Sequence, residues 1–576
     1  MFRKAVYSIP IFIIIALALL VPRLVGIDKF TTGDEPAWLI FSHNYLHAID
    51  IGEFEQTAYE YHPAVTTLWS ITAGILSYFP GYIHIKHGYI EKFWELDDIY
   101  AAYKKSLAIV LYRSRMINVA IVCTALLLAF FLLRKLLETR TALVAILLVG
   151  FNPFYLGESR LLTHEGMAAA FVLVAVLSLL TFLNQGEKYR YLLISSAATG
   201  LALLTKSPTI LLIPLAGLIF LVNITYSWKD NRKRKKLVWR AIIQYLIWLG
   251  GLSLVYILLW PGMWVAPGKM LYGVYGNAIS YAFQGQRLLA AKEINPTNFS
   301  LDVIGIGEYL VAILYKTTPI LWVGVCLALI GVTARKIAPM GRNTKQIIFY
   351  LFLLTALYIL VFGIARGWNS LHYIMVAFVS LEVIAAIGWV WGVSWLGEKY
   401  AFFVKKSVQA VILSALVLLQ VSSVLPDYPY YYTYVNPLAQ ALKPDMEDTT
   451  VGYGEGLDLA AAYLRAKPNA KELTVSSHLG VGPFSYYFPG NTYPLMYQSK
   501  AYLTDRSAKW VRKSDYLVIY DIQQRPLNIG TKLLEALNSI PPEHVVMLNG
   551  LHYASIYKVS ELPPSVLDAL LPPERQ

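Results

Sequence analysis

Two adjacent carboxylates, Asp34 and Glu35, follow the first long apolar run of the chain, in the stretch KFTTGDEPAWLIFSHNY. Pro36 comes next, and proline is favoured in the first turn of a helix, so a helix is expected to begin here. The pair could cap that helix and stabilise it by about 1 kcal/mol. It could also supply a general base, because a carboxylate at a membrane boundary is partly desolvated and becomes a stronger base toward a hydroxyl.

More charged and imidazole side chains stand where other apolar runs end. They are Glu60 and His62 in EYHP, Glu158, Arg160, His164 and Glu165 in ESRLLTHEG, Lys206 in LLTKSP, Lys316 in YKTTP, and Arg366 and His372 in ARGWNSLHY. Each alone could be an interface anchor whose charged end reaches toward water. Together, bases and phosphate-binding cations at one depth suit a lipid-phosphate substrate.

The elements that must position these residues are apolar. The 576 residues are 57% hydrophobic and only 15% charged, which is typical of an integral membrane protein. Eleven runs could form helical spans. They lie near 8–27, 107–133, 141–157, 165–183, 190–205, 207–224, 238–260, 306–333, 347–365, 371–393 and 407–425. The segment 64–79 is shorter and rich in hydroxyl side chains, so we expect a juxtamembrane or re-entrant helix there.

Basic clusters set the orientation of these spans. If 64–79 does not cross, the clusters near 134–140, 188–190, 229–236, 335–345 and 399–406 all fall on the side of the N-terminus, which is then cytoplasmic. The loops 28–106 and 261–305 and the C-terminus then lie outside. The net charge is +13, and its densest basic run, KDNRKRKK, is then expected to be a cytoplasmic loop beside anionic lipid, so no nucleic acid is expected as a partner. The prediction is a multi-pass plasma-membrane protein.

The tail after residue 425 changes character. Strand-like runs, ELTVSS, DYLVIY, HVVML and ASIYKV, alternate with helical stretches such as 456–465. The sequence therefore predicts a polytopic α-helical membrane domain over 1–425, with about eleven transmembrane helices, and a small external α/β domain over 426–576.

Several motifs recur in one order along residues 8 to 470. They are TTGDEPAW, YHP, SRLLTHEG, GLALLTKSP, WPGMWV, YLVAILYKTTP, HYIMVAFVSLEVIAAIG, NPL and VGYGEGLDLAAAYL. This order resembles the family 39 and ArnT-like glycosyltransferases of the GT-C fold, relatives of the dolichyl-phosphate-mannose protein mannosyltransferases. The resemblance implies an enzyme that moves a sugar from a polyprenyl-phosphate donor, with inversion, to a hydroxyl of a protein, lipid or glycan acceptor on the outer face.

The resemblance also implies roles for single residues. Asp34 matches the catalytic carboxylate, with Glu35 beside it, and Glu165 stands where relatives commonly have a second acidic residue, Asp. His62 matches the position before proline in the HP or KP motif and is expected to bind substrate. Relatives often have Arg-Tyr where this chain has His372 and Tyr373. The phosphate clamp could therefore rest on Arg366 or Lys316 instead. The basic residues expected to bind the donor phosphate are Lys206, Lys316, Arg366, His372 and Arg160.

Two further features leave alternatives open. Aromatic side chains of the loop 261–305, Trp264 among them, could stack on the donor sugar, or the loop could be an interfacial amphipathic helix with no substrate contact. No cofactor is demanded by the pattern. Some relatives bind a metal, and the weak candidates for a divalent metal site are Glu60, His62 and His164.

Two other function classes compete with the transferase. A transporter or flippase for a lipid-linked sugar would place ionisable groups near the bilayer midplane and often shows related halves. Here the charges collect at one rim and no duplication is visible. A non-catalytic scaffold for the tail domain would leave the rim charges without a purpose.

Overall fold

The computed structural model describes residues 8–226, 234–286, 288, 292–301, 303–334, 338–365, 370–442 and 452–573. The chain forms two compact units. The first, called the membrane unit here, comprises Met1–Ile27, Phe41–Tyr89 and Arg113–Asn436. The second, called the sheet unit, comprises Asp28–Ile40, Ile90–Tyr112 and Pro437–Gln576. Helices α3 (Glu35–Asp50) and α6 (Leu107–Leu136) each contribute residues to both units.

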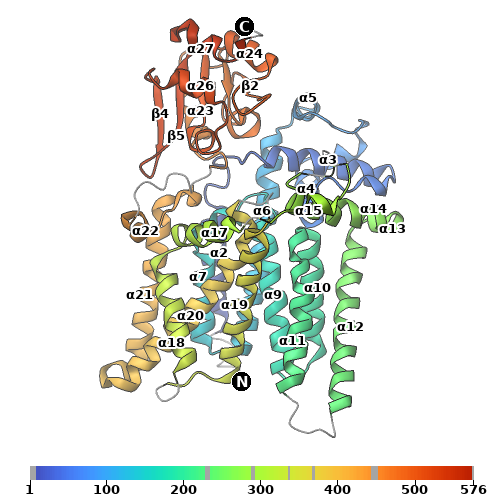
Figure 1. Cartoon of the computed structure of the whole chain (residues 1–576), viewed down its shortest axis with the longest axis vertical. Helices are drawn as coiled ribbons and strands as arrows, with labels where there is room; N and C mark the ends of the chain where they lie inside the picture. The colour runs from blue at the N-terminus through green and yellow to red at the C-terminus, as the bar shows by residue number, and fades with distance from the viewer. Residues whose placement is uncertain are drawn as a thin grey trace. The chain divides into compact units, whose positions relative to one another are not determined.

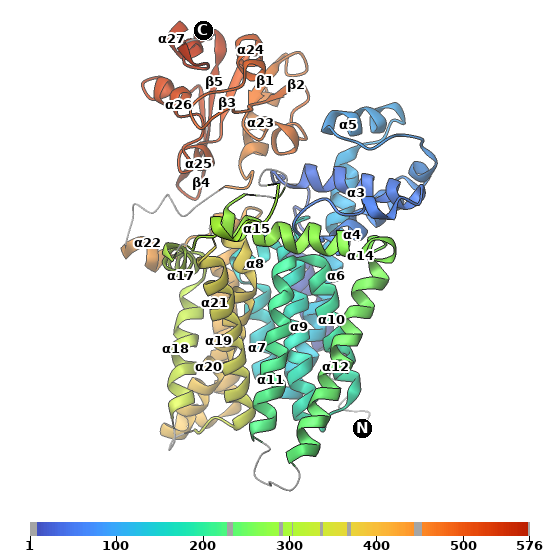
Figure 2. The same ribbon diagram turned by 45° about the vertical axis from the view of Figure 1, so that its right-hand side comes forward.

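Long apolar helices run side by side through the membrane unit (Figures 1 and 2). Their bounds are α2 (Ser8–Leu24), α6, α7 (Thr139–Gly150), α9 (Glu165–Asn184), α10 (Tyr189–Thr205), α11 (Leu212–Tyr226), α12 (Arg234–Leu259), α18 (Pro319–Thr333), α19 (Arg342–Gly363), α20 (Met375–Lys399) and α21 (Lys406–Val424). Among the described residues, seven helical segments are long and apolar enough to cross a membrane, or eight if one bent pair counts as a span. The predicted multi-pass architecture is confirmed, whereas the number eleven is not.

The predicted run 306–333 is not one continuous helix. It is built from α17 (Ile304–Lys316) and α18, which meet at an angle of 114°. Pro319 causes the break, because proline has no N–H for the helix ladder and pushes the preceding residue, Thr318, into an extended conformation.

Short helices lie across one end of the long ones. In both views α4 (Val65–Tyr78), α14 (Pro267–Leu271), α15 (Asn277–Gln284) and α17 cross that end (Figures 1 and 2). The helix expected over 64–79 is therefore present as α4. Helix α13 (Gly262–Val265) directly precedes α14 in the chain, and the short helix α8 (Pro153–Glu158) lies between α7 and α9.

Two helices form the centre of the membrane unit. Nearly every residue of α9 and α20 is buried, and α9 packs against both α10 and α20. Helix α20 also packs closely against α18 through glycine: a Cβ atom added to Gly388 would lie 1.9 Å from the backbone oxygen of Gly324. Small residues at such contacts let helix backbones approach each other inside a membrane.

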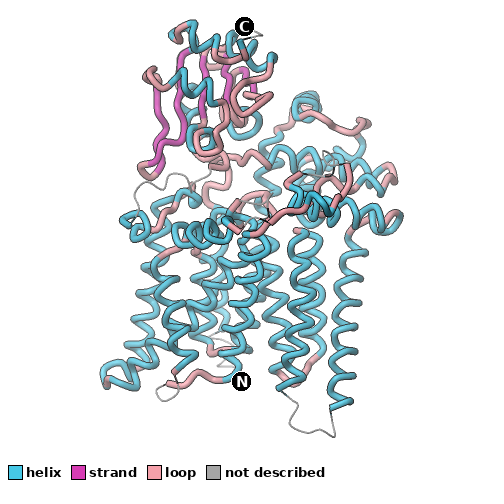
Figure 3. The backbone as a smooth tube through the Cα atoms, in the orientation of Figure 1, coloured by secondary structure: helices cyan, strands magenta, loops and turns pink. Residues whose placement is uncertain are grey.

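The sheet unit contains a five-stranded sheet of order β2-β1-β3-β5-β4 (Figure 3). Strands β2 (Asn491–Pro494), β1 (Thr474–Ser477) and β3 (Tyr516–Ile519) are parallel, and β5 (Leu551–Lys558) pairs antiparallel with both β3 and β4 (His544–Leu548). Side chains alternate between faces, so Val518 joins the core with α23 (Leu457–Arg465), whereas Leu517 packs with α24 (Asp505–Lys513), α26 (Thr531–Leu537) and α27 (Pro564–Asp568). The predicted small α/β region is confirmed.

Candidate active site

Helix α9 presents Glu165 at its first turn. The turn that leads to it is fixed by Asn152, whose side chain accepts a hydrogen bond from Tyr155 N and caps α8. Gly166 then lets α9 begin against the preceding loop, because a Cβ there would lie 2.7 Å from Ser159 Cα. A carboxylate in the first turn interacts favourably with the positive end of the helix dipole.

Lys206 forms a buried ion pair with Glu165. It follows the last residue of α10, and its Nζ lies 2.5 Å from Glu165 Oε1, with both side chains about 5–6% exposed. The ammonium also lies 4.3 Å from the centre of the Tyr373 ring, a cation–π contact. The structure therefore brings together two residues that the sequence places 41 positions apart.

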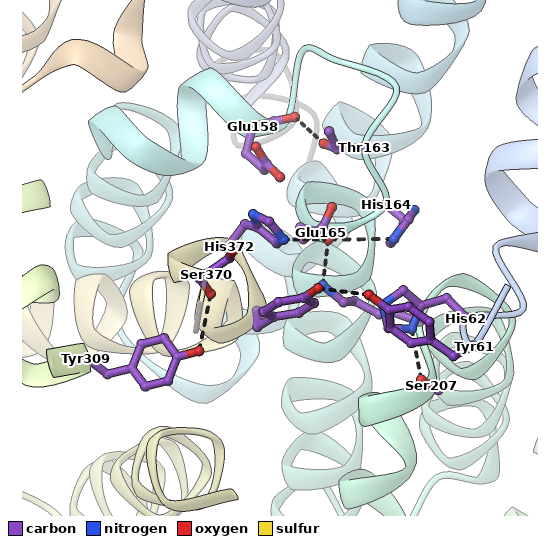
Figure 4. A network of polar contacts seen from close by, with 12 residues as sticks. Tyr61, His62, Glu158, Thr163, His164, Glu165, Ser207, Tyr309, Ser370 and His372 are labelled. Carbon is purple, nitrogen blue, oxygen red and sulfur yellow. Dashed lines mark hydrogen bonds and ion pairs between the residues drawn. The ribbon is translucent and has the colours of Figure 1, made fainter. Parts of the chain in front are cut away.

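Three histidines surround this pair (Figure 4). The Nε2 atoms of His164 and His372 lie 3.6 and 3.8 Å from Glu165 Oε1. His62 Nδ1 is 2.8 Å from Ser207 Oγ, and its ring packs edge-on against that of His164. His62 Nε2 is buried and has no hydrogen-bond partner among the described residues.

His62 and His164 are both neutral at physiological pH. Burial lowers the pKa of His164 to about 4. Burial, together with the nearby Lys206 ammonium, holds the pKa of His62 well below its usual range. His62 Nε2 is therefore able to accept or donate a hydrogen bond without adding charge.

A second carboxyl group, Glu158, adjoins Glu165. Burial and the neighbouring Glu165 carboxylate, with which it shares a side-chain hydrogen bond, raise the pKa of Glu158 well above its usual range. The Glu165 carboxylate itself is paired with the Lys206 ammonium. We call these residues the Glu165 cluster: Glu158, Glu165, Lys206, His62, His164 and His372.

Aromatic and hydroxyl side chains border the cluster, and sequence reasoning did not single them out as site residues. Tyr61 and Tyr373 share a hydrogen bond of 2.9 Å between their hydroxyl groups, and Ser207 holds His62. Tyr61, Tyr373 and Ser207 are the sequence neighbours of the predicted residues His62, His372 and Lys206. This adjacency is the only feature of the sequence that could have indicated them. Glu158 was recognised in the sequence as a carboxylate at the end of an apolar run, but it was not predicted to be a site residue.

Two of the predicted phosphate ligands bind backbone carbonyls instead of facing the cluster. Arg160 is buried and donates to Val25 O at 2.6 Å and to Pro429 O at 3.2 Å. Lys316 is buried and donates to Tyr432 O at 2.8 Å and Tyr434 O at 3.2 Å. These contacts favour structural roles, in which each cation ties distant parts of the membrane unit together. Arg366 lies outside the described residues.

Two further predicted residues of the membrane unit are Trp264 and Glu60. Trp264, in α13, is 53% exposed, and its Nε1 donates to Ile257 O while its ring packs against Phe54. Glu60 is half-buried. Within the described ranges, no group of three or more His, Cys, Asp or Glu side chains has the arrangement of a metal site, so we derive no step through a metal.

Asp34 and Glu35 belong to the sheet unit and differ in their surroundings. Glu35 is buried, and its Oε2 accepts from Thr32 N at 2.9 Å while Thr32 Oγ1 accepts from Glu35 N at 3.3 Å. These reciprocal bonds resemble those of a capping box and fix the backbone just before α3. Asp34 is exposed. The geometry thus divides the predicted pair into a helix cap and a carboxylate open to solvent.

Residues 111–260 match the sequence profile of a family described as dolichyl-phosphate-mannose-protein mannosyltransferase. The matched stretch contains Glu158, Glu165 and Lys206. The chain is related to these mannosyltransferases. Over this stretch the match supports the predicted relationship and the predicted enzyme class, a glycosyltransferase.

Three solved structures are among those similar to the chain. ArnT from Cupriavidus metallidurans bound to undecaprenyl phosphate is 12% identical, with a TM-score of 0.46, over 99% of this chain and 100% of that one. The apo oligosaccharyltransferase of Archaeoglobus fulgidus is 12% identical, with a TM-score of 0.44, over 91% and 72%. The S. cerevisiae Pmt1-Pmt2 O-mannosyltransferase complex with its sugar donor is 16% identical, with a TM-score of 0.35, over 51% and 37%. No curated protein sequence matches the chain.

Proposed function

We propose that this glycosyltransferase works on the outer face of the plasma membrane, binds the phosphate of its polyprenyl-linked donor at Lys206 and His62, and uses Asp34 as the base that activates the acceptor hydroxyl. The observation that carries the proposal is the buried Lys206–Glu165 pair, which lies in the stretch that matches the mannosyltransferase profile. A buried lysine beside neutral imidazoles offers donors to an anion in a region of low dielectric constant.

The order of the helices supports the outer face. Helix α9 begins at Glu165 and ends at Asn184, and α10 begins at Tyr189 and ends beside Lys206. The cluster therefore lies at one end of this helix pair, and the basic residues Lys188 and Arg190 lie at the other. Positively charged loops favour the cytoplasm, so the cluster is assigned to the opposite, outer side, with the N-terminus inside and the C-terminal unit outside.

The reaction follows from these roles. The acceptor oxygen attacks the anomeric carbon from the face opposite the phosphate and passes its proton to Asp34. The bond between the anomeric carbon and the phosphate oxygen breaks, and its electron pair leaves with the polyprenyl phosphate. Lys206 stabilises the charge that develops on that leaving group, because an ammonium at the leaving oxygen binds the transition state more tightly than the ground state.

A transfer assay tests the proposal. The purified protein in detergent would receive a synthetic short-chain polyprenyl-phosphate hexose and the envelope fraction of cells that lack the gene. Mass spectrometry would follow both free polyprenyl phosphate and sugar in a new glycosidic bond. Lys206→Met is expected to lower kcat/KM for the donor by about 10- to 100-fold, the equivalent of one charge-assisted hydrogen bond of about 1.5–3 kcal/mol.

Two controls make the assay decisive. Lys269→Met removes an exposed lysine that pairs with Glu55 and should leave turnover unchanged. In the single variant Lys206→Met, the Glu165 carboxylate stays buried without its lysine. The double variant Lys206→Met with Glu165→Gln removes that charge and repeats the test without the instability that it causes.

Native kcat/KM for the donor in Lys206→Met would show that Lys206 does not bind the phosphate. Movement of the sugar across a membrane without a new glycosidic bond would establish a transporter instead.

A further inference from the structure

The motif VGYGEGLDLAAAYL in the sheet unit has no role in the chemistry described so far. Its glycine-rich part, residues 452–456, lies directly before α23. Glu455 anchors this loop: it is 1% exposed, and its Oε2 accepts hydrogen bonds from Tyr453 N at 2.7 Å and from Tyr520 OH at 3.0 Å. Tyr520 follows the last residue of β3 and also accepts from Gly454 N at 2.9 Å. The loop is thereby fixed to the end of β3.

The anchored loop holds the backbone just before Asp34. Gly33 N donates to Tyr453 O at 3.0 Å. Gly454 approaches the same segment so closely that a Cβ there would lie 2.2 Å from Thr31 O, and its φ of +130° is one that other residues rarely adopt. Glycine is therefore required at position 454 by its φ angle and by the contact with Thr31.

Residues 482–487 of the sheet unit also contact the segment 28–36, both before and after Asp34. Tyr487 OH lies 3.0 Å from Thr31 Oγ1 and 3.2 Å from Asp28 O. Gly482, with φ of +86°, packs against the proline that follows the two carboxylates: a Cβ there would lie 2.3 Å from Pro36 Cγ. The backbone is thus fixed before and after Asp34, while the Asp34 side chain stays exposed.

We propose that the loop 452–456, anchored by Glu455, is a positioning element for Asp34. The proposal rests on the proposed function, in which Asp34 is the base. A base displaced by about 1 Å loses about 10²-fold in rate, because the proton transfer requires a defined distance and angle. The C-terminal unit then contributes to turnover through backbone hydrogen bonds and contacts, and Glu455 acts on Asp34 by holding the loop that contacts Gly33 and Thr31.

Matched glycine variants of the full-length protein test this role. Gly454→Ala places a methyl group against Thr31, whereas Gly530→Ala, also at positive φ (+72°), places one 2.8 Å from Tyr497 and touches no residue of 28–36. Gly454→Ala is expected to lower kcat about 10²-fold and to leave the KM for the donor unchanged, because the phosphate ligands are in the other unit. Gly530→Ala is expected to keep native kcat. Melting temperatures of both variants separate a loss of positioning from a loss of folding.

Substitutions of Glu455 provide a second test that does not depend on strain. Glu455→Gln keeps one oxygen for both Tyr453 N and Tyr520 OH and should keep most of the native kcat, whereas Glu455→Ala should lose about as much as Gly454→Ala. If Glu455→Gln and Glu455→Ala lose kcat equally, the negative charge of Glu455 acts directly, and the positioning role is wrong.

Asp34→Asn separates failure of this inference from failure of the proposed function. If Asp34→Asn is inactive and both Gly454→Ala and Glu455→Ala keep native kcat, only the positioning role is wrong. If Asp34→Asn itself turns over at the native rate, the proposed base is wrong, and the positioning role is wrong with it.

Discussion

Lys206 Nζ and Glu165 Oε1 lie 2.5 Å apart, and the two side chains are buried between the end of α10 and the start of α9. The pair brings a cation and a carboxylate into a region that also holds neutral histidines. Such a pair costs free energy to desolvate, so its retention at one end of the helix bundle agrees with a role in binding a charged group.

The first prediction concerns the stability of this pair. Lys206→Met alone leaves Glu165 buried and unpaired and should lower the free energy of unfolding by about 3–5 kcal/mol. The double variant with Glu165→Gln should recover most of that loss, because no charge of the pair is then buried. Chemical unfolding in a mild detergent measures both. A double variant as unstable as the single one would show that the pair contributes through packing and not through charge.

The second prediction concerns pH. The pKa of His164 is lowered to about 4 in the folded protein, from the ordinary 6.5, so the unfolded state binds more protons between these values. Stability should therefore fall as the pH drops below about 6.5, with a contribution from His164 of about 2 kcal/mol by pH 5. Glu158, whose pKa is raised, acts in the opposite sense and loses its contribution as the pH rises above its unfolded value near 4.5.

A pair of histidine variants measures the pH effect. His164→Phe keeps a ring but removes the titration, so its unfolding free energy should depend less on pH between 7 and 5 than that of the native protein. His84→Phe replaces an exposed histidine and should leave the native slope. If the unfolding free energy of His164→Phe depends on pH as strongly as that of the native protein, His164 is not the group that titrates.

The third prediction separates the two adjacent carboxylates. Glu35→Ala removes the acceptor of Thr32 N and should destabilise the protein by about 1 kcal/mol, the usual value of a helix cap, while most of the transfer rate remains. Glu35→Gln keeps an acceptor oxygen and should lie closer to the native stability. Thermal unfolding and the transfer assay check the two quantities separately. A complete loss of transfer in Glu35→Gln would give Glu35 the catalytic role instead.

The fourth prediction concerns packing inside the membrane unit. Gly388→Ala forces a methyl group against Gly324 O and should cost about 1–3 kcal/mol, because the close contact of α18 and α20 must open. Gly250→Ala, in the middle of α12, meets no atom within 4 Å and should be neutral or stabilising by up to about 1 kcal/mol. Unfolding in detergent compares the two, and a similar effect of both substitutions would contradict the close contact.

Apolar runs were sufficient to predict most of the helices and the tail strands. The prediction of 165–183 agrees with α9, and DYLVIY contains β3, because burial on all sides leaves a continuous apolar pattern in the sequence. Strand β2, with the sequence NTYP, was not predicted, since four residues without alternation carry no strand signal. Pro319 could have predicted the break between α17 and α18. The apolar run 306–333 was instead interpreted as one span because of its length.

The chemistry of the site was less predictable than the helices. Lys206, Lys316 and Arg160 have the same kind of sequence environment, a cation at the end of an apolar run. Only the folded chain shows that Lys206 meets a carboxylate whereas Lys316 and Arg160 meet backbone carbonyls. Likewise, the sequence presents Asp34 and Glu35 as equals, and the capping bond to Thr32 distinguishes them. Partners distant in sequence decide these roles.

The most direct test of the account is sugar transfer by Asp34→Asn from a synthetic polyprenyl-phosphate donor. The variant has the same shape as the native residue but cannot accept the proton. A general base supplies about 10²–10⁴-fold, so the variant should lose about that factor in kcat, equivalent to about 3–5 kcal/mol of barrier, with an unchanged melting temperature. Transfer by Asp34→Asn at the native rate would contradict the account.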